Sequence, residues 1–218
     1  MLLQYCSDLH LEFPENKRWF NKYSLQPMAP VLVLAGDILP FYELNGYHEF
    51  FDQLSTNFEM TYWIPGNHEY YHADITERSG AFSEKIRENV VLLNDQAVVH
   101  DDVKLLLSTL WSKTSEARKW KIERSLNDFH EISNGERFFS VGDSNRLHED
   151  SVSFLKGQLD KHDEMKTVVI THHAPTFLNY PPRYKSSELS EAFATELHDF
   201  IEGCGSKAWI YGHTHYNT

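Results

Sequence analysis

Short apolar runs recur along the chain between polar segments, and each run has the length of a buried strand. The clearest runs are Leu2–Cys6, Val31–Ala35, Met60–Ile64, Val103–Leu107, Val168–Thr171 and Ala208–Tyr211. Two further runs, Val90–Leu93 and Ala97–His100, flank the turn-like pair Asn94-Asp95. We therefore expect antiparallel strands between residues 92 and 107, and sheets of mixed strand direction.

Amphipathic helices are predicted between some of these strands, because apolar residues recur three or four positions apart. The spacing is seen at Phe82, Ile86 and Val90, at Val152, Leu155 and Leu159, and at Leu189, Phe193 and Leu197 with Gly203 as the stop. Residues 47–58 show part of the same pattern. Strands that alternate with helices indicate an α/β architecture in which helices flank the sheets.

The 218 residues contain no repeat, linker or low-complexity block, so we expect a single domain over residues 1–218. The longest apolar stretch, Val31–Ala35, is far too short to span a membrane. Twenty Lys and Arg against 32 Asp and Glu give a net charge of −12, which should repel nucleic acid and anionic lipid. A local site can still bind phosphate, because a bound metal reverses the local field.

Cysteine content bears on where the protein works. Cys6 and Cys204 are isolated and form no CxxC pair, which is typical of a reducing compartment. Residues 1–8 lack the basic region and the long apolar core of a secretion signal. We therefore expect a cytoplasmic protein without a membrane partner, and its oligomeric state stays open.

Turns that carry Asp, Asn or His follow five of the apolar runs directly. These turns are Asp8-Leu9-His10, Gly36-Asp37, Gly66-Asn67-His68-Glu69, His172-His173-Ala174-Pro175 and Gly212-His213-Thr214-His215. In open α/β sheets, ligands bind beyond the carboxyl ends of the strands. One such turn alone is usually a cap or a solvated loop, but five in order predict a multinuclear metal site.

The residue types in these turns indicate which metals would bind. Carboxylate and imidazole suit Mn, Fe, Zn or Co rather than a thiolate-held structural zinc. Asp37 stands alone in its loop, so its two carboxylate oxygens could bridge two ions. Asp8 and His10 are two positions apart, as are His213 and His215, and in an extended segment such pairs point to the same side.

Taken together, the five turns resemble the calcineurin-like metallophosphoesterases, whose pattern is D-x-H, G-D, G-N-H-[DE], a His, and G-H-x-H. The blocks span residues 8–215, and the stretches Ser7–Glu12, Leu126–Phe129 and Thr171–Pro175 are similar to small bacterial cytosolic phosphoesterases of uncharacterised substrate. The resemblance implies a four-layer α/β/β/α sandwich, whereas the residue pattern alone gives only a mixed α/β fold. Relatives typically continue with further strands, so it stays open whether C-terminal strands are missing after Thr218.

The resemblance also implies hydrolysis of phosphomonoesters or phosphodiesters with two divalent metal ions (Mn, Fe, Zn or similar). The first ion would be held by Asp8, His10, Asp37 and His215. The second would be held by Asp37, Asn67, His172 and His213, with Asp37 as the bridge. His172 is preferred to His173 because the family's ligand directly follows the strand. His173 is then a substrate contact, a support for a ligand, or a packed residue.

By the same resemblance, His68 is a catalytic residue and not a ligand. It would protonate the leaving oxygen or bind the phosphoryl group while a metal-activated water attacks phosphorus in line. The alternative is that His68 orients Asp37. The stretch Gly36–Phe41 lacks the second acid and the Arg of the G-D-x-x-D-R-G motif in protein Ser/Thr phosphatases. This argues against a phosphoprotein phosphatase of that type and leaves the acid that orients His68 unidentified.

Three further residues are candidate substrate contacts outside the turns. Asn127 and Asp128 lie in a polar segment after Trp111 that could form a lid, with a surface helix and loop as the alternative. Arg183 lies in the loop that follows the His172 turn, where a basic side chain could reach a phosphate, with a solvated loop as the alternative.

Two other functions remain open on this fold. A nuclease would need a DNA-binding platform and usually a longer chain, and a charge of −12 without a basic stripe makes nucleic acid an unexpected partner. A non-catalytic interaction scaffold would have lost catalytic residues, whereas this chain keeps every ligand and His68. Metal dependence separates an enzyme from a scaffold, because a scaffold should keep its function when Asp37 is replaced by alanine. The expected partner is a small phosphate ester.

Overall fold

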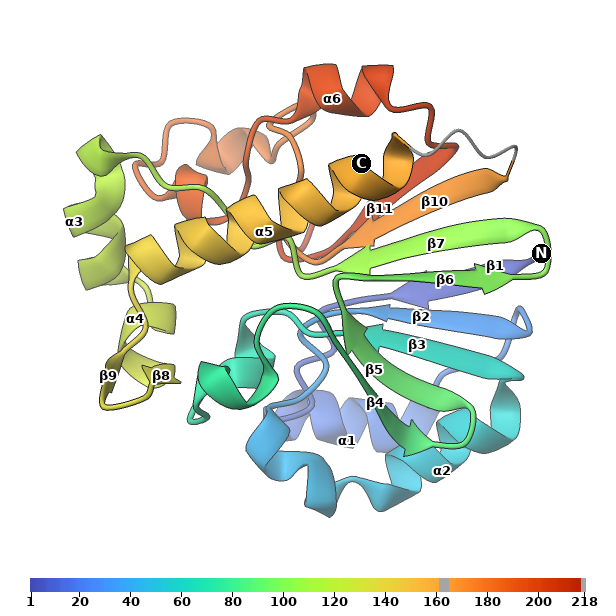
Figure 1. Ribbon diagram of the computed structural model, residues 1–218. Helices are drawn as coiled ribbons and strands as arrows, with labels where there is room; N and C mark the ends of the chain where they lie inside the picture. Colours follow the sequence, from blue (N-terminus) through green and yellow to red (C-terminus); the bar gives the residue numbers. More distant parts are fainter. Residues whose placement is uncertain (161–164, 217–218) are drawn as a thin grey trace.

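Two mixed β-sheets form the centre of the computed structural model (Figure 1). The structure describes residues 1–160 and 165–216, so Thr218 lies outside the described residues. The first sheet consists, in spatial order, of β1 (Leu3–Cys6), β2 (Val31–Ala35), β3 (Met60–Ile64), β5 (Val90–Asn94) and β4 (Phe82–Arg87). The second consists of β11 (Ala208–Tyr211), β10 (Lys166–Thr171), β7 (Val103–Ser108) and β6 (Gln96–His100). Neighbouring strands are parallel except in the antiparallel pairs β4–β5 and β6–β7.

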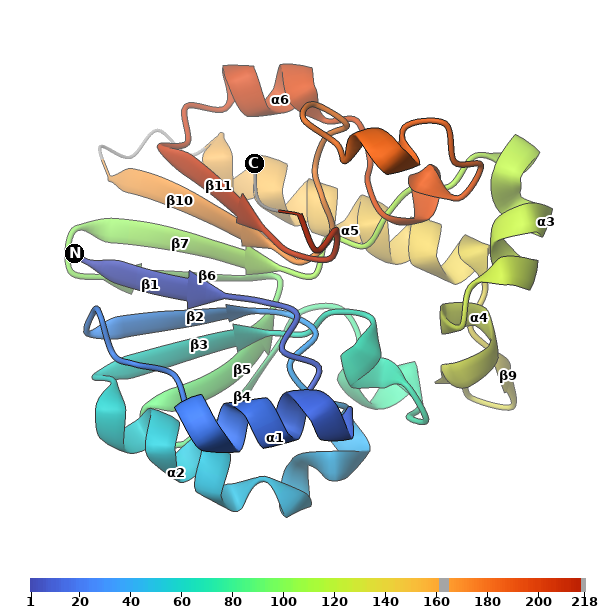
Figure 2. The ribbon, with the colours of Figure 1, turned by 180° about the vertical axis from the view of Figure 1, so that it is seen from behind.

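Helices cover the outer face of each sheet (Figures 1 and 2). Helices α1 (Pro14–Tyr23) and α2 (His48–Asn57) lie on the first sheet, whereas α5 (Val141–Leu159) and α6 (His198–Gly203) lie on the second. Beyond one end of the strands lie α3 (Glu116–Ser125), α4 (Asp128–Glu131), β8 (Ser133–Asn134) and β9 (Arg137–Phe138). Short 3₁₀ helices are at Phe41–Gly46, His68–Tyr70, Ile75–Arg78, Pro182–Tyr184 and Ser190–Ala192. No helix in the described ranges has both the length and the apolar character needed to cross a membrane.

Three apolar clusters show why the chain stacks into four layers. Strand β2 is buried along its whole length: Val31 and Val33 pack between the two sheets, while Leu32 packs toward α1 and α2. On the other side of the second sheet, Leu106 packs against Leu155 of α5. Because successive strand side chains point to opposite faces, a sheet covered on both sides must be apolar throughout. The α/β/β/α sandwich and the mixed sheets are thus confirmed.

Most of the predicted elements are present. The six clearest apolar runs are strands, residues 47–58 contain α2, and Val152–Leu159 lies within α5. The strands predicted on either side of Asn94-Asp95 also exist, but they belong to different sheets, because the chain crosses from β5 to β6 at Asp95. The antiparallel neighbour of β6 is β7.

The helix predicted from Phe82, Ile86 and Val90 is wrong. Phe82–Arg87 is strand β4, and Val90 begins β5. Positions four apart share one face of a helix, but they also share one face of a strand. From Phe82 to Ile86 the even-numbered positions are the less exposed ones, which is the period of a half-buried strand.

The helix predicted from Leu189 to Leu197 is also wrong. This segment holds one short 3₁₀ turn, and α6 begins only at His198 and includes Gly203. Its backbone groups bond to the loop that follows β10: Ala174 donates to the carbonyl of Phe193 at 3.2 Å, and Leu197 donates to the carbonyl of Pro175 at 2.9 Å. These bonds use backbone groups that a continuous helix would need for itself.

Candidate metal centre

The carboxyl ends of five parallel strands, three in one sheet and two in the other, meet at one end of the sandwich. All seven predicted ligands lie in the turns that follow these strands: Asp8, His10, Asp37, Asn67, His172, His213 and His215. Backbone bonds hold the turns side by side. The amide of Asp8 donates to the carbonyl of Gly36 at 3.0 Å, and the amide of Gly212 donates to the carbonyl of His172 at 3.0 Å.

Backbone strain recurs in these turns. Five of the seven predicted ligands have φ between 45° and 66°, namely Asp8, His10, Asp37, His213 and His215. A non-glycine residue in this left-handed region costs roughly 1–3 kcal/mol and persists only where its surroundings impose the conformation. Strain of this kind clusters at functional sites, so the turns have the backbone character of a site that positions its side chains.

One group of side chains surrounds the end of β1. The Nε2 atom of His10 lies 3.2 Å from Nε2 of His215, which in turn lies 3.3 Å from Oδ1 of Asp8. Asp8 is held in place because its carboxylate accepts a hydrogen bond from the backbone amide of His213 at 3.0 Å. Two imidazoles and a carboxylate within 4.8 Å of one another form a donor set suited to a divalent transition metal.

A second group lies beside the first and is linked to it by Asp37. The Nε2 atom of His172 lies 3.1 Å from Nδ1 of His213 and 3.3 Å from Oδ2 of Asp37. The same Oδ2 lies 3.7 Å from Nε2 of His10, which belongs to the first group. Asp37 therefore lies between the two donor sets, and all three members of the second group are buried.

Asn67 supplies an oxygen that lacks a hydrogen-bond partner within the described ranges. Its Oδ1 is buried and unpaired, while its Nδ2 donates to Oδ1 of Asp128 at 2.8 Å. The hydroxyl of Tyr71 donates to the same oxygen of Asp128 at 2.8 Å. A buried carbonyl oxygen without a partner is costly, and a cation would satisfy it. Asp128, a predicted substrate contact, is itself buried, and its carboxylate bonds to Asn67 and Tyr71.

Glu12 lies beside His68 and was not singled out from the sequence. One oxygen, Oε1, lies 2.9 Å from Nδ1 of His68 and 3.2 Å from Nδ1 of His10. Its position in the same turn, two residues after the predicted ligand His10, is the available signal in the sequence. Burial tends to lower the pKa of His68, but the hydrogen bond to Glu12 and the charge of Asp37 raise it above its ordinary value.

Glu69 joins two of the ligand turns. Its buried carboxylate accepts hydrogen bonds from the backbone amides of Asp37 at 2.9 Å, Ile38 at 2.8 Å and Gly66 at 2.7 Å. Burial and the charge of Asp37 raise the pKa of Glu69 to about 7. Gly66 has to be glycine here, because a Cβ would overlap the carboxylate of Asp37 and lie 2.6 Å from Nε2 of His172. The last acid of G-N-H-E thus holds the turns together.

The electrostatics of the site favour a bound cation. Asp37 is only 2% exposed, and burial alone would raise its pKa, yet the charge and hydrogen bond of His172 hold that pKa well below the ordinary value. The pKa of Asp8 is also lowered: burial opposes this, and the hydrogen bond with His215, the charge of His172 and the hydrogen bond with Ser7 together outweigh it. Buried carboxylates that stay ionised attract positive charge, which a metal ion can supply in place of the protonated His172.

A cavity of about 290 Å³, here called the main cavity, opens over this cluster and is lined by Asp37, Asn67, His68, Tyr71 and Asn127, among others. A second cavity of about 400 Å³, the side pocket, contains Arg183. The structure therefore places Asn127 and Arg183 at separate cavities. His173 is 1% exposed, and its ring packs 4.2 Å from that of His213.

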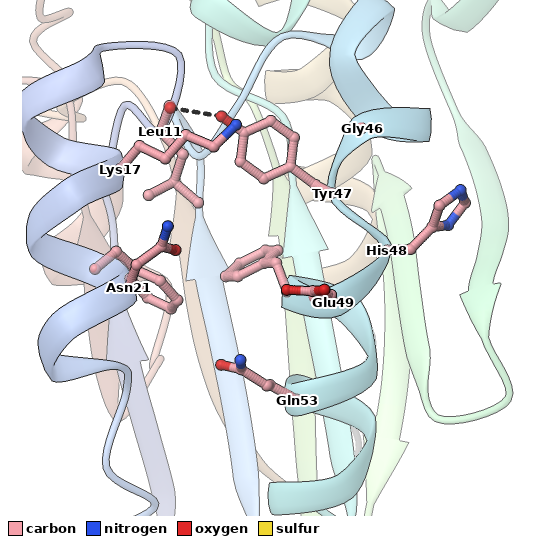
Figure 3. A pocket seen from close by; sticks show the side chains of 10 residues that line it. Leu11, Lys17, Asn21, Gly46, Tyr47, His48, Glu49 and Gln53 are labelled. Atoms are coloured by element: carbon pink, nitrogen blue, oxygen red, sulfur yellow. Dashed lines mark hydrogen bonds between the residues drawn. The ribbon is translucent and has the colours of Figure 1, made fainter.

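A third cavity, of about 310 Å³, lies between α1 and the start of α2 and contains none of the candidate ligands (Figure 3). In it, the hydroxyl of Tyr47 donates a hydrogen bond to the carbonyl of Leu11 at 2.6 Å. The ammonium of Lys17 lies 4.2 Å from the centre of the Tyr47 ring. This bond ties the backbone between His10 and Glu12 to the beginning of α2, which helps to hold both side chains at the site.

Comparison with known proteins agrees with this geometry. The family profile described as calcineurin-like phosphoesterase matches residues 4–217. The chain belongs to this family. The uncharacterised protein L509 of Acanthamoeba polyphaga mimivirus is 32% identical over 243 residues, covering 100% of this chain and 85% of that protein. Among solved structures, the phosphopantetheinyl hydrolase PptH of Mycobacterium tuberculosis has a TM-score of 0.70 at 20% identity, covering 99% of this chain and 83% of that chain, which shows a shared fold.

Proposed function

We propose that this member of the family is a metal-dependent hydrolase of phosphate monoesters or diesters that uses two divalent ions such as Mn, Fe or Zn. The observation that carries the proposal is the convergence of the predicted ligands into two adjacent donor groups linked by Asp37. The unpaired, buried Oδ1 of Asn67 supports it, because that atom needs a cation or a donor that the described residues do not provide.

The donor atoms support an assignment of ligands to each ion. One ion would be held by Asp8, His10, Asp37 and His215, and the other by Asp37, Asn67, His172 and His213. Nδ1 of His172 lies 2.9 Å from the carbonyl of Ala35, and this bond leaves Nε2 as the ligand atom. When bound, the ions would activate a water as nucleophile and neutralise the phosphate oxygens.

His68 is proposed as the proton donor to the leaving oxygen. Its Nδ1 is taken by Glu12, so Nε2 is the nitrogen that remains to hold a proton beside the main cavity. Its backbone amide, rather than its side chain, donates to Oδ1 of Asp37 at 3.0 Å. That division of contacts favours a role on the substrate over a role in orienting Asp37.

Glu12 and Asp128 are proposed as positioning residues. Glu12 bonds to Nδ1 of both His10 and His68, so one carboxylate orients a ligand and the proton donor together. Asp128 bonds to the amide nitrogen of Asn67 and thereby fixes which way its oxygen points. Asn127, which lines the main cavity, is kept as a substrate contact, whereas the proposal gives the buried His173 a packing role against His213.

The other functional classes are less well supported. The ligand candidates and His68 are all present, which a non-catalytic scaffold would not require. The net charge of −12 disfavours the nucleic acid that a nuclease would bind. The proposal keeps the cytoplasm as the site of action, in line with the free thiols of Cys6 and Cys204.

The test is hydrolysis of p-nitrophenyl phosphate and bis-p-nitrophenyl phosphate by the purified protein. We expect turnover of one or both substrates with added Mn²⁺, loss of turnover after dialysis against a chelator, and recovery when Mn²⁺, Fe²⁺ or Zn²⁺ is returned. Turnover that survives removal of metal, verified by elemental analysis, would contradict a metal mechanism. Absence of turnover with every ion would contradict the proposed hydrolase.

A further inference from the structure

The side pocket differs in chemistry from the main cavity. Its volume is about 400 Å³, and its walls include the rings of Tyr180, Tyr184 and Phe193, the side chain of Leu189 and the guanidinium of Arg183. Tyr180 is 5% exposed and packs against the ring of Phe177, so this wall is set by the core of the protein. The pocket therefore offers a surface for an apolar or aromatic group, with one cation at hand.

Both cavities meet at the candidate metal centre. Phe193, His213 and His215 line the main cavity and the side pocket alike. The centre of the Phe193 ring lies 4.9 Å from the centre of the His213 ring, and both residues are part of the wall of each cavity. His68 lines the main cavity and not the side pocket. A phosphoryl group between the two donor sets would thus have room for an organic group on each of two sides.

Arg183 has no carboxylate partner among the residues that the structure describes. Its guanidinium lies 4.6 Å from the centre of the Tyr184 ring. By contrast, the nearby Arg118 is paired with Glu188 at 2.5 Å. In a chain with a net charge of −12, an unpaired guanidinium beside a candidate metal centre is suited to an anionic group on the substrate.

We propose that the side pocket binds the substituent that stays on phosphorus, and that the substrate is a phosphodiester whose retained substituent is apolar or aromatic and carries an anion for Arg183. This inference rests on the proposed function. A proton donor must lie beside the leaving oxygen, so the leaving group belongs in the main cavity with His68. A monoester has a single organic group and would leave the side pocket to water.

The reaction balances as a hydrolysis. The water oxygen bonds to phosphorus, the bond from phosphorus to the leaving oxygen breaks, and that oxygen receives a proton from His68. The products are an alcohol or phenol, released through the main cavity, and a phosphomonoester whose organic group occupies the side pocket. The water's proton passes to solvent and His68 is reprotonated, so no further reactant is needed.

The test uses four substrates with one leaving group, p-nitrophenolate, so that only the retained group varies. They are p-nitrophenyl phosphate and the methyl, phenyl and 4-carboxyphenyl esters of p-nitrophenyl phosphate. For the Mn²⁺-loaded protein we expect kcat/KM to be about tenfold higher for the phenyl than for the methyl diester, because the ring is buried in the pocket. The 4-carboxyphenyl diester should gain roughly threefold more through Arg183, and the monoester should be the slowest substrate.

Two variants test the walls of the pocket. Tyr184→Ala should bring the phenyl-to-methyl ratio toward one, and Arg183→Gln should remove the gain from the carboxyl group. The matched controls are Tyr23→Ala and Lys22→Gln, a cation–π pair on α1 with Nζ 4.9 Å from the ring that lines neither cavity. Both controls should keep the wild-type ratios, since neither touches the substrate.

The outcomes separate this inference from the proposed function. If no substrate is hydrolysed with any metal, the proposed function fails. If hydrolysis is metal-dependent but the monoester is the best substrate, or the methyl and phenyl diesters react alike, the hydrolase stands and the side-pocket proposal is overturned. The proposal is also overturned if Tyr184→Ala and Arg183→Gln behave like the controls.

Discussion

Replacing Glu12 by Gln should separate the work of His68 from the work of the metal ligands. The side chain of Glu12 is 12% exposed, so solvent cannot readily replace its contacts. Its Oε1 lies 2.9 Å from Nδ1 of His68 and 3.2 Å from Nδ1 of His10. Glutamine keeps the size and one acceptor but removes the charge. A charge-assisted hydrogen bond contributes about 1.5–3 kcal/mol, so its loss corresponds to a rate decrease of roughly 10- to 100-fold.

The assay compares esters with good and poor leaving groups on the Mn²⁺-loaded variant. A p-nitrophenolate group leaves without a proton, whereas an alkoxide needs one. Glu12→Gln should therefore slow an alkyl ester by the full factor and a p-nitrophenyl ester by less. Because Glu12 also bonds to His10, the variant should need a higher Mn²⁺ concentration for half-maximal activity, by about 10- to 100-fold.

Glu15→Gln is the matched control, since Glu15 lies in the same segment, is 74% exposed and pairs only with Arg18 among the described residues. It should behave as wild type in both measurements. The reasoning is refuted if Glu12→Gln slows alkyl and p-nitrophenyl esters equally with saturating metal, because the effect would then not pass through the proton of His68. It is also refuted if Glu12→Gln matches the control.

Three further predictions concern single substitutions. Asp37→Ala should lose metal and activity together, because Asp37 lies between both donor sets; elemental analysis that finds two ions per chain in this variant would contradict the bridging role. His68→Ala should keep both ions and lose about 10²–10⁴-fold in rate on an alkyl ester; loss of metal from this variant would make His68 structural. Asp143→Asn should lower the free energy of unfolding by about 1 kcal/mol at pH 7, because the Asp143 carboxylate forms a capping box with Ser140 at the start of α5. The hydrogen-bonded ion pair with Arg137 lowers the pKa of Asp143 from 3.8, so this stabilisation is present above pH 3.8 and is lost as the pH falls through the lower folded-state pKa. Urea titrations should show that the difference in unfolding free energy between wild type and Asp143→Asn disappears in acid. A difference that persists in acid would count against this explanation.

Local sequence was sufficient for the strands and for the turns after them. A strand such as β2 is buried on both faces, so it must read as a continuous apolar run. The residue types of Asp37 and Asn67 mark the turns that follow the strands, and parallel strands bring their carboxyl ends together. The mixed α/β class and the position of the candidate site could therefore be predicted from local sequence, whereas the four layers were implied only by the resemblance to the family.

Helices with little buried surface were harder to predict. Only Phe20 is buried in α1, and only Ile122 is buried in α3, so neither segment shows an apolar stripe. Charged and polar residues occupy most of their other positions. Conversely, Phe82 and Ile86 have the spacing of a helix but lie in strand β4, where pairing with β5 decides the conformation.

Contacts between distant residues account for what the sequence left open at the site. Glu12 meets His68 across 56 positions, and Asp128 meets Asn67 across 61 positions. The stretch after Gly36-Asp37 lacks the second acid of the G-D-x-x-D-R-G motif, which left the acid that orients His68 unidentified, and the structure places Glu12, which follows the D-x-H turn, beside His68. Such a pairing depends on how β1 and β3 lie in the sheet, which no local pattern records.

The most direct test of the central claim is an anomalous-scattering map from crystals grown with Mn²⁺. We expect two peaks roughly 3.5–4 Å apart, the usual spacing of a two-metal site, with the Asp37 carboxylate between them. One peak should contact Asp8, His10 and His215, and the other should contact Asn67, His172 and His213. A single peak at full Mn²⁺ occupancy, or peaks bound away from these side chains, would contradict the account.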